Sequence, residues 1–138
     1  MIDGEKILIT GATGKIAFPI ARALAKHNEV WGAARLGKPG DGDRLAAAGV
    51  RALRLDMSSG DFSMVPGDFT YVFHAAVDPG AEDWRRCVRT NADHSGELMH
   101  HCRKAKGCSL SAASPTHDTS KLLAFRSFTG IRLIHRSA

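Results

Sequence analysis

The 138-residue sequence predicts an α/β protein in which parallel strands alternate with helices. Three observations favour this class: short apolar runs recur along the chain, patterns of helical period separate them, and a glycine-rich turn joins the first run to the first of these patterns. Strands separated by helices pair in parallel through right-handed crossovers. The composition, 43% hydrophobic and 24% charged residues, is that of an ordinary globular domain.

The first unit of the chain consists of a strand, a tight turn and a helix. Ile7–Ile9 is a short apolar run typical of a buried strand, Thr10–Gly14 forms the turn, and apolar residues of helical spacing follow from Ile16 to Ala25. Such a unit presents free backbone N–H groups at the start of a helix, where a partial positive charge also favours a phosphate. Glycine suits a turn in which φ is positive or a ligand comes close. A plain glycine-rich turn without a ligand is the alternative.

The turn has the spacing Gly11-x-x-Gly14-x-x-Ala17 directly after a strand. On these residues the chain resembles the cofactor fingerprint of the short-chain dehydrogenase/reductase superfamily, and it is most similar to the extended branch, the NAD-dependent epimerase/dehydratase family. The resemblance implies a Rossmann-type fold that binds NAD or NADP. It also implies that the dinucleotide contacts the residues of the turn: Gly11, Thr13, Gly14, Lys15 and Ile16.

The end of the second strand, predicted over Asn28–Arg35, bears on the choice between the two cofactors. In a dinucleotide-binding fold an acidic residue here bonds the adenosine ribose of NAD, whereas an arginine pairs with the 2′-phosphate of NADP. This strand ends in Arg35, with Lys38 shortly after it and no acidic residue at its end. We therefore expect NADP rather than NAD. In the alternative interpretation, Arg35 and Lys38 are solvated loop charges.

The third strand is predicted over Val50–Leu55, after a loop over Leu36–Asp43 and a short helix over Arg44–Ala48. Asp56 and Met57 follow it. The family resemblance implies that this pair contacts the adenine ring of the cofactor. Alternatively, Asp56 is an ordinary capping residue of the loop after the strand.

The fourth strand is predicted over Phe69–Ala76 and ends in small residues. This ending is similar to the V-x-H-x-A-A pattern at the same place in the extended family. Small side chains at Ala75 and Ala76 leave room for the dinucleotide over the strand end, where a large side chain would block its path. A buried strand that happens to end in alanines is the alternative.

A long helix is predicted over Ala81–Ala105, with acidic residues in its first turn, basic residues in its last turn and Gly107 after it. Its Thr90-Asn91-Ala92 segment resembles a motif of the extended family. The resemblance implies that Asn91 bonds the backbone of the fourth strand and helps to order the active site. A helix-interior polar residue without a task is the alternative.

The resemblance stops at Gly107. The family would continue with an apolar fifth strand that ends in a catalytic serine, followed by a Tyr-x-x-x-Lys motif. Residues 107–115 are instead small and polar, which disfavours a buried strand. His117 and Lys121 have the motif's spacing with histidine in the tyrosine position, and we assign them to the tail because imidazole is shorter and more acidic than a phenol. The catalytic residues are therefore unassigned.

We divide the chain into a partial NAD(P)-binding Rossmann domain, residues 1–106, and an atypical tail, residues 107–138. The predicted fold is a Rossmann-type parallel sheet with flanking helices, truncated after about four strands and followed by an irregular tail. Degenerate codons read in a shifted frame from Gly107 permit Val-Phe-Ala-Val-Ser-Ser-x-x-Tyr, so the tail is interpreted as off-frame or disordered. A sheet truncated in this way exposes the edge of its fourth or first strand, which favours a homodimer.

Charge and cysteine usage limit the partners. The net charge is +5, but residues 107–138 hold four basic residues against one acidic residue, so the rest of the chain is nearly neutral. No basic stripe indicates nucleic acid, and no apolar stretch is long enough to cross a membrane. Three cysteines without secretory context predict reduced thiols in the cytoplasm. No metal is expected, because no zinc-site spacing occurs among the residues His100, His101, Cys102 and Cys108.

Together these observations predict an NAD(P)-binding fragment of an NAD-dependent epimerase/dehydratase-type oxidoreductase. We expect this polypeptide to be inactive, because the chain contains no Tyr-x-x-x-Lys. The sequence does not specify its small-molecule substrate. The alternative is a non-catalytic, redox-sensing module that binds the dinucleotide.

Overall fold

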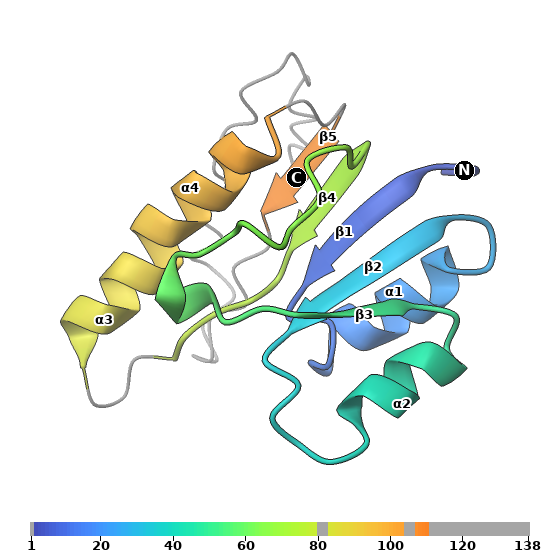
Figure 1. The fold of residues 1–138 in the computed structure, drawn as a ribbon, viewed down its shortest axis with the longest axis horizontal. Coiled ribbons are helices and arrows are strands. Elements are labelled where there is room, and N and C mark those ends of the chain that lie inside the picture. Colours follow the sequence, from blue (N-terminus) through green and yellow to red (C-terminus); the bar gives the residue numbers. More distant parts are fainter. Residues whose placement is uncertain (1, 80–82, 104–106, 111–138) are drawn as a thin grey trace, which may run out of the picture.

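The computed structural model describes residues 2–79, 83–103 and 107–110. Its centre is a parallel sheet of five strands in the order β3-β2-β1-β4-β5 (Figure 1). The predicted Rossmann-type parallel sheet with flanking helices is confirmed. The strands are β1 (Lys6–Thr10), β2 (Glu29–Ala34), β3 (Arg51–Arg54), β4 (Tyr71–His74) and β5 (Gly107–Leu110).

Helices cover both faces of the sheet (Figure 1). One face carries two separate helices, α1 (Ala17–Leu24) and α2 (Asp41–Ala47). The other face carries one continuous helical stretch, which consists of α3 (Trp84–Val88), a π-helical turn η2 (Arg89–Asp93) and α4 (His94–His101). A short 3-10 helix, η1 (Met57–Ser59), follows β3 and packs against η2 and α4.

The central strand β1 is buried on both of its faces, and Ile7, Leu8 and Ile9 are each at most 2% exposed. Successive residues of a strand point to opposite faces of the sheet. Leu8 therefore packs in the core on the α4 side with Leu98, while Ile7 and Ile9 pack in the core on the α1 side with Ala21. Burial on both faces explains why this strand is an unbroken apolar run in the sequence.

The segment between β3 and β4 covers part of the sheet, although the sequence indicates only a loop over Ser58–Asp68. Phe62 and Val65 are 7% and 3% exposed and belong to the core on the α4 side. The imidazole Nε2 of His101 hydrogen-bonds the Val65 carbonyl at 2.6 Å, which ties this segment to α4. The loop is thus anchored through two apolar side chains that show no strand or helix period.

Element boundaries differ from the predicted ones at several ends. α2 begins at Asp41, before the predicted start at Arg44, because Gly40 takes a φ of +86° and turns the loop directly into the helix. The long predicted helix is described from Trp84 to His101. The Asp83 side chain caps it by accepting from the backbone N–H groups of Arg85 and Arg86. Its remaining predicted ends, residues 81–82 and 104–105, lie outside the described residues.

The sheet runs past residue 106, since β5 pairs in parallel with β4 from Tyr71↔Gly107 to His74↔Leu110. The small, polar side chains of residues 107–115 disfavour a strand, so backbone pairing with β4 accounts for β5 better than side-chain propensity does. The expectation that the fourth or first strand forms an exposed edge is wrong, because β4 and β1 each have neighbours on both sides. Residues 111–138, with the interpretations placed on them, lie outside the described residues.

Leu8→Ala should lower the free energy of unfolding by about 2–5 kcal/mol, because it removes methyl groups that are completely buried in the central strand. Urea denaturation followed by circular dichroism measures this change. The control Met64→Ala, at a side chain that is 76% exposed, should change it by less than about 0.5 kcal/mol. Equal losses in the two variants would contradict the central position of β1.

Candidate functional site

A cleft of about 660 Å³ lies at the carboxyl ends of the strands and is lined by residues that follow β1, β2, β3 and β4. From β1 the chain proceeds to β2 on one side, whereas β4 lies on the other side of β1 (Figure 1). Open α/β sheets bind ligands at such a change of direction, outside the carboxyl ends of the strands. Topology alone therefore makes this cleft the first candidate for a ligand site.

The turn after β1 depends on two glycines. Gly11 has a φ of +68°, and a Cβ at this position would lie 2.9 Å from the backbone nitrogen of Ala76 and 3.0 Å from the carbonyl carbon of Ala75. Gly14 donates its N–H to the Gly11 carbonyl at 2.8 Å, and a Cβ on Gly14 would lie 3.0 Å from that oxygen. The turn can therefore lie directly against the end of β4 because Gly11 lacks a side chain, and it can close on itself because Gly14 lacks one.

Some backbone N–H groups of the turn and of the helix start have no acceptor within the described part of the chain. This holds for Thr13, Lys15 and Ile16, while the N–H of Phe18 already bonds the Gly14 carbonyl at 3.0 Å. Ile16 stands at the N-cap of α1 and offers no capping side chain. Unsatisfied amides at the start of a helix attract anions, through hydrogen bonding and the helix dipole together.

A buried chain of hydrogen bonds links the turn to β4 and to α4. The Thr10 hydroxyl accepts from the N–H groups of Ala75 and Ala76, both at 3.2 Å, and lies 2.5 Å from the Nδ1 of His74. The Nε2 of the same imidazole lies 2.9 Å from the Ser95 hydroxyl, which is 3.4 Å from the Thr90 carbonyl.

The acceptor count assigns the protons in this chain. Since Thr10 Oγ1 already accepts two N–H groups, its own proton goes to Nδ1 of His74. Nε2 of His74 then carries the ring proton and donates to Ser95, whose hydroxyl donates to the carbonyl of Thr90. Burial lowers the pKa of His74 to about 4, so the imidazole is neutral at pH 7.

Basic side chains gather where β2 ends. Arg35, Lys38 and Arg44 all line the cleft, and Asp41 is the acidic residue beside them. The Arg44 guanidinium lies 3.6 Å from the centre of the Phe18 ring and reaches the Thr13 carbonyl at 3.4 Å, which holds it over the glycine turn. The carboxylate of Asp41 accepts from the backbone N–H of Lys38 at 3.2 Å.

Asp56, at the end of β3, is both a capping residue and a residue of the cleft. Its carboxylate caps η1 by accepting from the N–H and the hydroxyl of Ser58, at 3.0 and 2.8 Å, and it also lines the cleft. Partial burial alone would raise the pKa of Asp56, but the hydrogen bonds from Ser58 and the charges of Arg35 and Arg86 outweigh it and hold the pKa below 3.8. Met57 lines the cleft and is 8% exposed.

Asn91 holds the loop that follows β4. Its amide oxygen accepts from the N–H of Asp78 at 2.8 Å, and its amide nitrogen donates to the Asp78 carbonyl at 2.8 Å and to Cys87 Sγ at 3.2 Å. The Asp78 carboxylate pairs with Nε of Arg86 at 3.1 Å. Asn91 thus has a positioning task, but it acts on the loop beyond β4 rather than on the strand itself.

The structure brings most of the predicted site residues to one cleft. Eight of the eleven line it, namely Gly11, Thr13, Gly14, Arg35, Asp56, Met57, Ala75 and Ala76. Lys15, Ile16 and Asn91 do not: the side chain of Ile16 is 55% exposed, and Asn91 stands behind the loop that it holds.

Arg44, Arg86 and Thr90 are among the lining residues that were not predicted as ligand contacts. Each belongs to a helix, and only the packing of these helices reveals which side of them faces the cleft. The i, i+4 spacing of Arg86 and Thr90 places both on one helical face, but such spacing is common in any helix.

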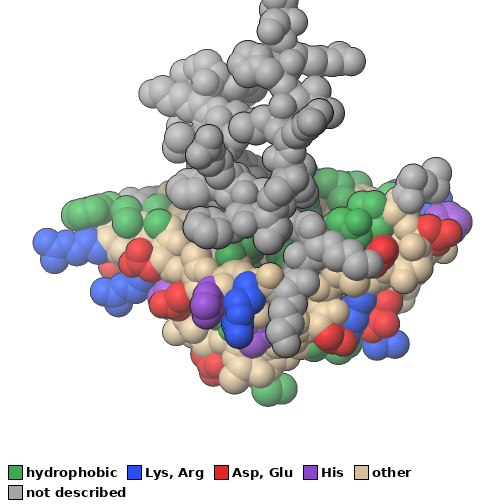
Figure 2. All heavy atoms as spheres, turned by 90° about the horizontal axis from the view of Figure 1, so that it is seen from above, with side chains coloured by type: hydrophobic (Ala, Val, Ile, Leu, Met, Phe, Trp, Pro, Cys, Tyr) green, Lys and Arg blue, Asp and Glu red, His purple; other side chains and the backbone are tan. Residues whose placement is uncertain are grey.

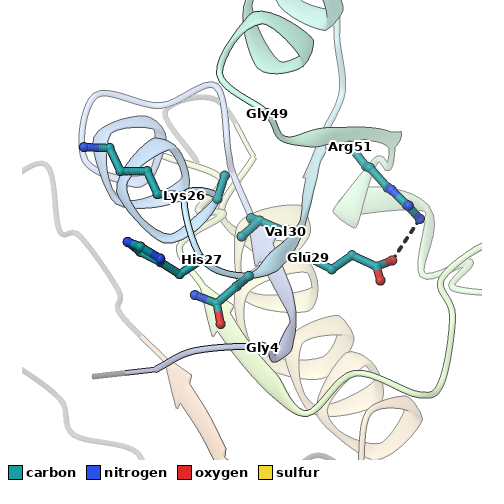
Figure 3. Close-up of a pocket in the computed structure, with 9 residues that line it drawn as sticks. Gly4, Lys26, His27, Glu29, Val30, Gly49 and Arg51 are labelled. Atoms are coloured by element: carbon teal, nitrogen blue, oxygen red, sulfur yellow. Dashed lines mark hydrogen bonds and ion pairs between the residues drawn. The ribbon is translucent and has the colours of Figure 1, made fainter.

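A second cavity, of about 630 Å³, lies at the opposite, amino-terminal end of the strands (Figure 3). It is an open depression beside the ion pair between Arg51 and Glu29, which are 2.8 Å apart. Open parallel sheets bind ligands at the carboxyl ends of their strands, so this cavity at the amino-terminal ends is a weaker candidate for a ligand site.

On the visible part of the face drawn in Figure 2, the charged groups of the described residues indicate no further site. On the face drawn in Figure 2, Lys and Arg side chains are interspersed with Asp and Glu, and the described residues form no large patch of one sign. Among residues 2–79, 83–103 and 107–110 there is no cluster of potential metal ligands and no helix with the length and apolarity of a membrane span. His117 and Lys121 lie outside the described residues.

The model of the NAD dependent epimerase/dehydratase family matches residues 7–118 of the chain. No curated protein sequence matches significantly. The family match covers the glycine turn, the strand ends around the cleft and the helix that contains Asn91.

Solved structures share the fold. UDP-glucuronic acid 4-epimerase from Bacillus cereus in complex with NAD has a TM-score of 0.64 and 24% identity, over 87% of this chain and 46% of that one. UDP-N-acetylglucosamine 4-epimerase from Methanobrevibacter ruminantium has a TM-score of 0.63 and 21% identity, over 89% and 45%. RhlG of Pseudomonas aeruginosa, in an NADP complex, has a TM-score of 0.60 and 19% identity, over 73% and 46%. The chain spans just under half the length of these structures.

The free energy of unfolding should fall by about 3 kcal/mol as the pH drops from 6.5 to about 4, because the unfolded chain takes up a proton at His74 that the folded chain does not. Above pH 6.5 the imidazole is neutral in the folded and the unfolded state, so His74 causes no further change in the free energy of unfolding. Urea denaturation across this pH range measures the slope. His74→Gln should flatten it, and an unchanged slope in that variant would show that another group is responsible.

Proposed function

The chain belongs to the NAD dependent epimerase/dehydratase family, and on this premise we propose that its cleft binds a nicotinamide dinucleotide. The observation that carries the proposal is the glycine turn. Gly11 lies against the backbone of Ala75 and Ala76, and the N–H groups of Thr13, Lys15 and Ile16 are left without an acceptor among the described residues. These groups suit the pyrophosphate of the cofactor, which supplies hydride transfer when it is bound.

The two halves of the dinucleotide would occupy the two sides of this turn. The adenosine half extends toward the ends of β2 and β3, where Arg35, Asp56 and Met57 line the cleft. The nicotinamide half extends over Ala75 and Ala76 toward the other side of the sheet, where small side chains leave room for it. In this arrangement, Asn91 serves by holding the loop at Asp78 rather than by contact with the cofactor.

NADP is the proposed cofactor in preference to NAD. Arg35, Lys38 and Arg44 give the β2 side of the cleft three cationic side chains against the carboxylate of Asp41. A guanidinium pairs with a 2′-phosphate, which NADP has and NAD lacks. The solved structures of similar fold include complexes of both cofactors, so this preference rests on the side chains of the chain itself.

We propose further that the 138-residue polypeptide binds the dinucleotide without turning it over. The chain contains one tyrosine, Tyr71, which lies in β4 and is followed four residues later by Ala75, so it offers no Tyr-x-x-x-Lys. A formed cleft without this proton donor also favours the second candidate, a redox-sensing module that distinguishes cofactor states by binding.

The thiol of Cys87, which donates to the Asp78 carbonyl at 3.3 Å, is compatible with the proposed cytoplasmic location. Homodimerisation stays a prediction.

Calorimetric titration should give saturable binding of NADPH, and Arg35→Ala should weaken it about tenfold or more while changing NADH binding less than threefold. The reason is the loss of a charge-assisted contact with the 2′-phosphate. Arg51→Ala is the matched control, because Arg51 pairs with Glu29 at the other end of the strands and should leave both affinities unchanged. Equal weakening of NADPH and NADH by Arg35→Ala would contradict the NADP assignment.

The same preparation should show no NADPH oxidation or NADP⁺ reduction when mixed with secondary alcohols, ketones or nucleotide sugars, as followed by absorbance at the nicotinamide band. The chain has no Tyr-x-x-x-Lys to exchange a proton with such a substrate. Sustained turnover by the purified polypeptide would overturn the non-catalytic part of the proposal. Failure to bind either dinucleotide would overturn the whole.

A further inference from the structure

Ser95 in α4 belongs to the buried hydrogen-bond chain, yet it is not one of the residues that line the cleft. It is 5% exposed, and its hydroxyl bonds the His74 imidazole, which is 3% exposed. The chain ends at Thr10, whose hydroxyl accepts from the N–H groups of Ala75 and Ala76, and these three residues do line the cleft. A side chain behind the cleft is thus connected through two others to residues that form its surface.

The hydroxyl oxygen of Thr10 has three nitrogen neighbours. Two are the backbone N–H groups of Ala75 and Ala76, at 3.2 Å each, and the third is Nδ1 of His74, at 2.5 Å. A hydroxyl has one proton to donate and two lone pairs that accept. All three contacts are hydrogen bonds only when Nδ1 carries no proton. A proton on Nδ1 would force the hydroxyl proton toward one of the two backbone N–H groups.

Ser95 favours the required tautomer from the other side of the imidazole. A neutral ring carries one proton, so a bare Nδ1 requires a protonated Nε2, and that buried N–H needs an acceptor. The Ser95 oxygen lies 2.9 Å from Nε2 of His74. Its own proton points elsewhere, since the Ser95 hydroxyl donates to the Thr90 carbonyl at 3.4 Å. Ser95 therefore faces His74 as an acceptor.

The π-helical turn η2 explains the direction of the Ser95 hydroxyl. In a regular helix a serine hydroxyl bonds the carbonyl three or four residues earlier. Thr90 is five residues before Ser95, and the wider turn η2 lies between α3 and α4 at this point. Such turns are rare and are frequent at functional sites. The carbonyl in η2 keeps the Ser95 proton away from His74.

Without the Ser95 oxygen, the ring proton of His74 would move from Nε2 to Nδ1. Buried N–H groups without an acceptor are rarer in proteins than bare acceptors, and on Nδ1 the proton would meet the Thr10 oxygen. The Thr10 hydroxyl proton would then displace the N–H of Ala75, which has a second acceptor in the Thr10 carbonyl at 3.3 Å. The end of β4 would lose one of the bonds that hold it against the β1 turn.

We propose that Ser95 is a positioning residue for dinucleotide binding, which fixes the tautomer of His74 and through it the position of Ala75 at the surface of the cleft. The inference rests on the proposed function, in which the nicotinamide half of the cofactor extends over Ala75 and Ala76. Ser95 acts through His74 and Thr10 and does not contact the cofactor itself.

Ser95→Ala removes the acceptor and tests the proposal through the protonation of the ring. Long-range ¹H–¹⁵N spectra at pH 7, where the imidazole is neutral, distinguish a bare ring nitrogen from a protonated one. The signals of His74 are those that disappear in His74→Gln. Nδ1 should be bare in the unmodified protein and protonated in Ser95→Ala. Calorimetry should show NADPH binding about three- to tenfold weaker in Ser95→Ala, the effect of one lost hydrogen bond.

Two variants serve as controls. Ser95→Thr keeps the hydroxyl and should retain the tautomer, with NADPH affinity within about twofold of the unmodified protein. Met99→Ala shortens a half-buried side chain of the same helix that packs against the core, so it lowers stability without touching the hydrogen-bond chain. It should leave both the tautomer and the NADPH affinity unchanged.

Nδ1 that stays bare in Ser95→Ala would overturn the inference. Equal weakening of NADPH binding in Ser95→Ala and Met99→Ala would assign Ser95 a purely structural role and overturn it as well. If the unmodified protein binds NADPH and Ser95→Ala binds it equally well, the further inference alone is refuted. If the unmodified protein binds neither NADPH nor NADH, the proposed function itself fails.

Discussion

The close approach of the β1 turn to the end of β4 is the constraint on which the rest of the site depends. Gly11 permits it, since a Cβ there would lie 2.9 Å from the backbone of Ala76. Because the two segments lie this close, the Thr10 hydroxyl accepts hydrogen bonds from the N–H groups of both Ala75 and Ala76, at 3.2 Å each. The proton of that hydroxyl engages a neutral His74, which in turn engages Ser95 of α4. One turn, two strands and a helix are thereby fixed relative to one another, and the cleft forms between them.

The positions around the cleft that were predictable are those where backbone geometry restricts the residue type. Gly11 and Gly14 leave a trace in the sequence because a side chain at either would collide with nearby backbone. The apolar run of β1 was predictable because burial on both faces leaves no polar position in it. Arg35 was predictable as a lining residue because it follows a strand, and the carboxyl ends of parallel strands meet at one edge of the sheet.

The parts of the cleft and of the sheet that were not predicted depend on packing, which a single sequence does not reveal. Arg44 reaches the turn only because α2 packs beside α1, where its guanidinium covers Phe18 at 3.6 Å. Thr90 lines the cleft from a π-helical turn that interrupts the helix at that point. β5 forms over Gly107–Leu110 although its side chains do not favour a strand, since the open edge of β4 offers a row of backbone partners. In each case the deciding neighbour is distant in the sequence or depends on a local irregularity.

The central claim is that the bare amides of the glycine turn bind the pyrophosphate of a dinucleotide. A titration of the ¹⁵N-labelled protein with NADPH, followed by ¹H–¹⁵N correlation spectra, tests it most directly. We predict saturable shifts of the Thr13, Lys15 and Ile16 amide signals, while the signals of Gly4 and Gly49, beside the cavity at the other end of the strands, do not shift. Shifts confined to Gly4 and Gly49, or NADPH binding that leaves the turn signals in place, would contradict it.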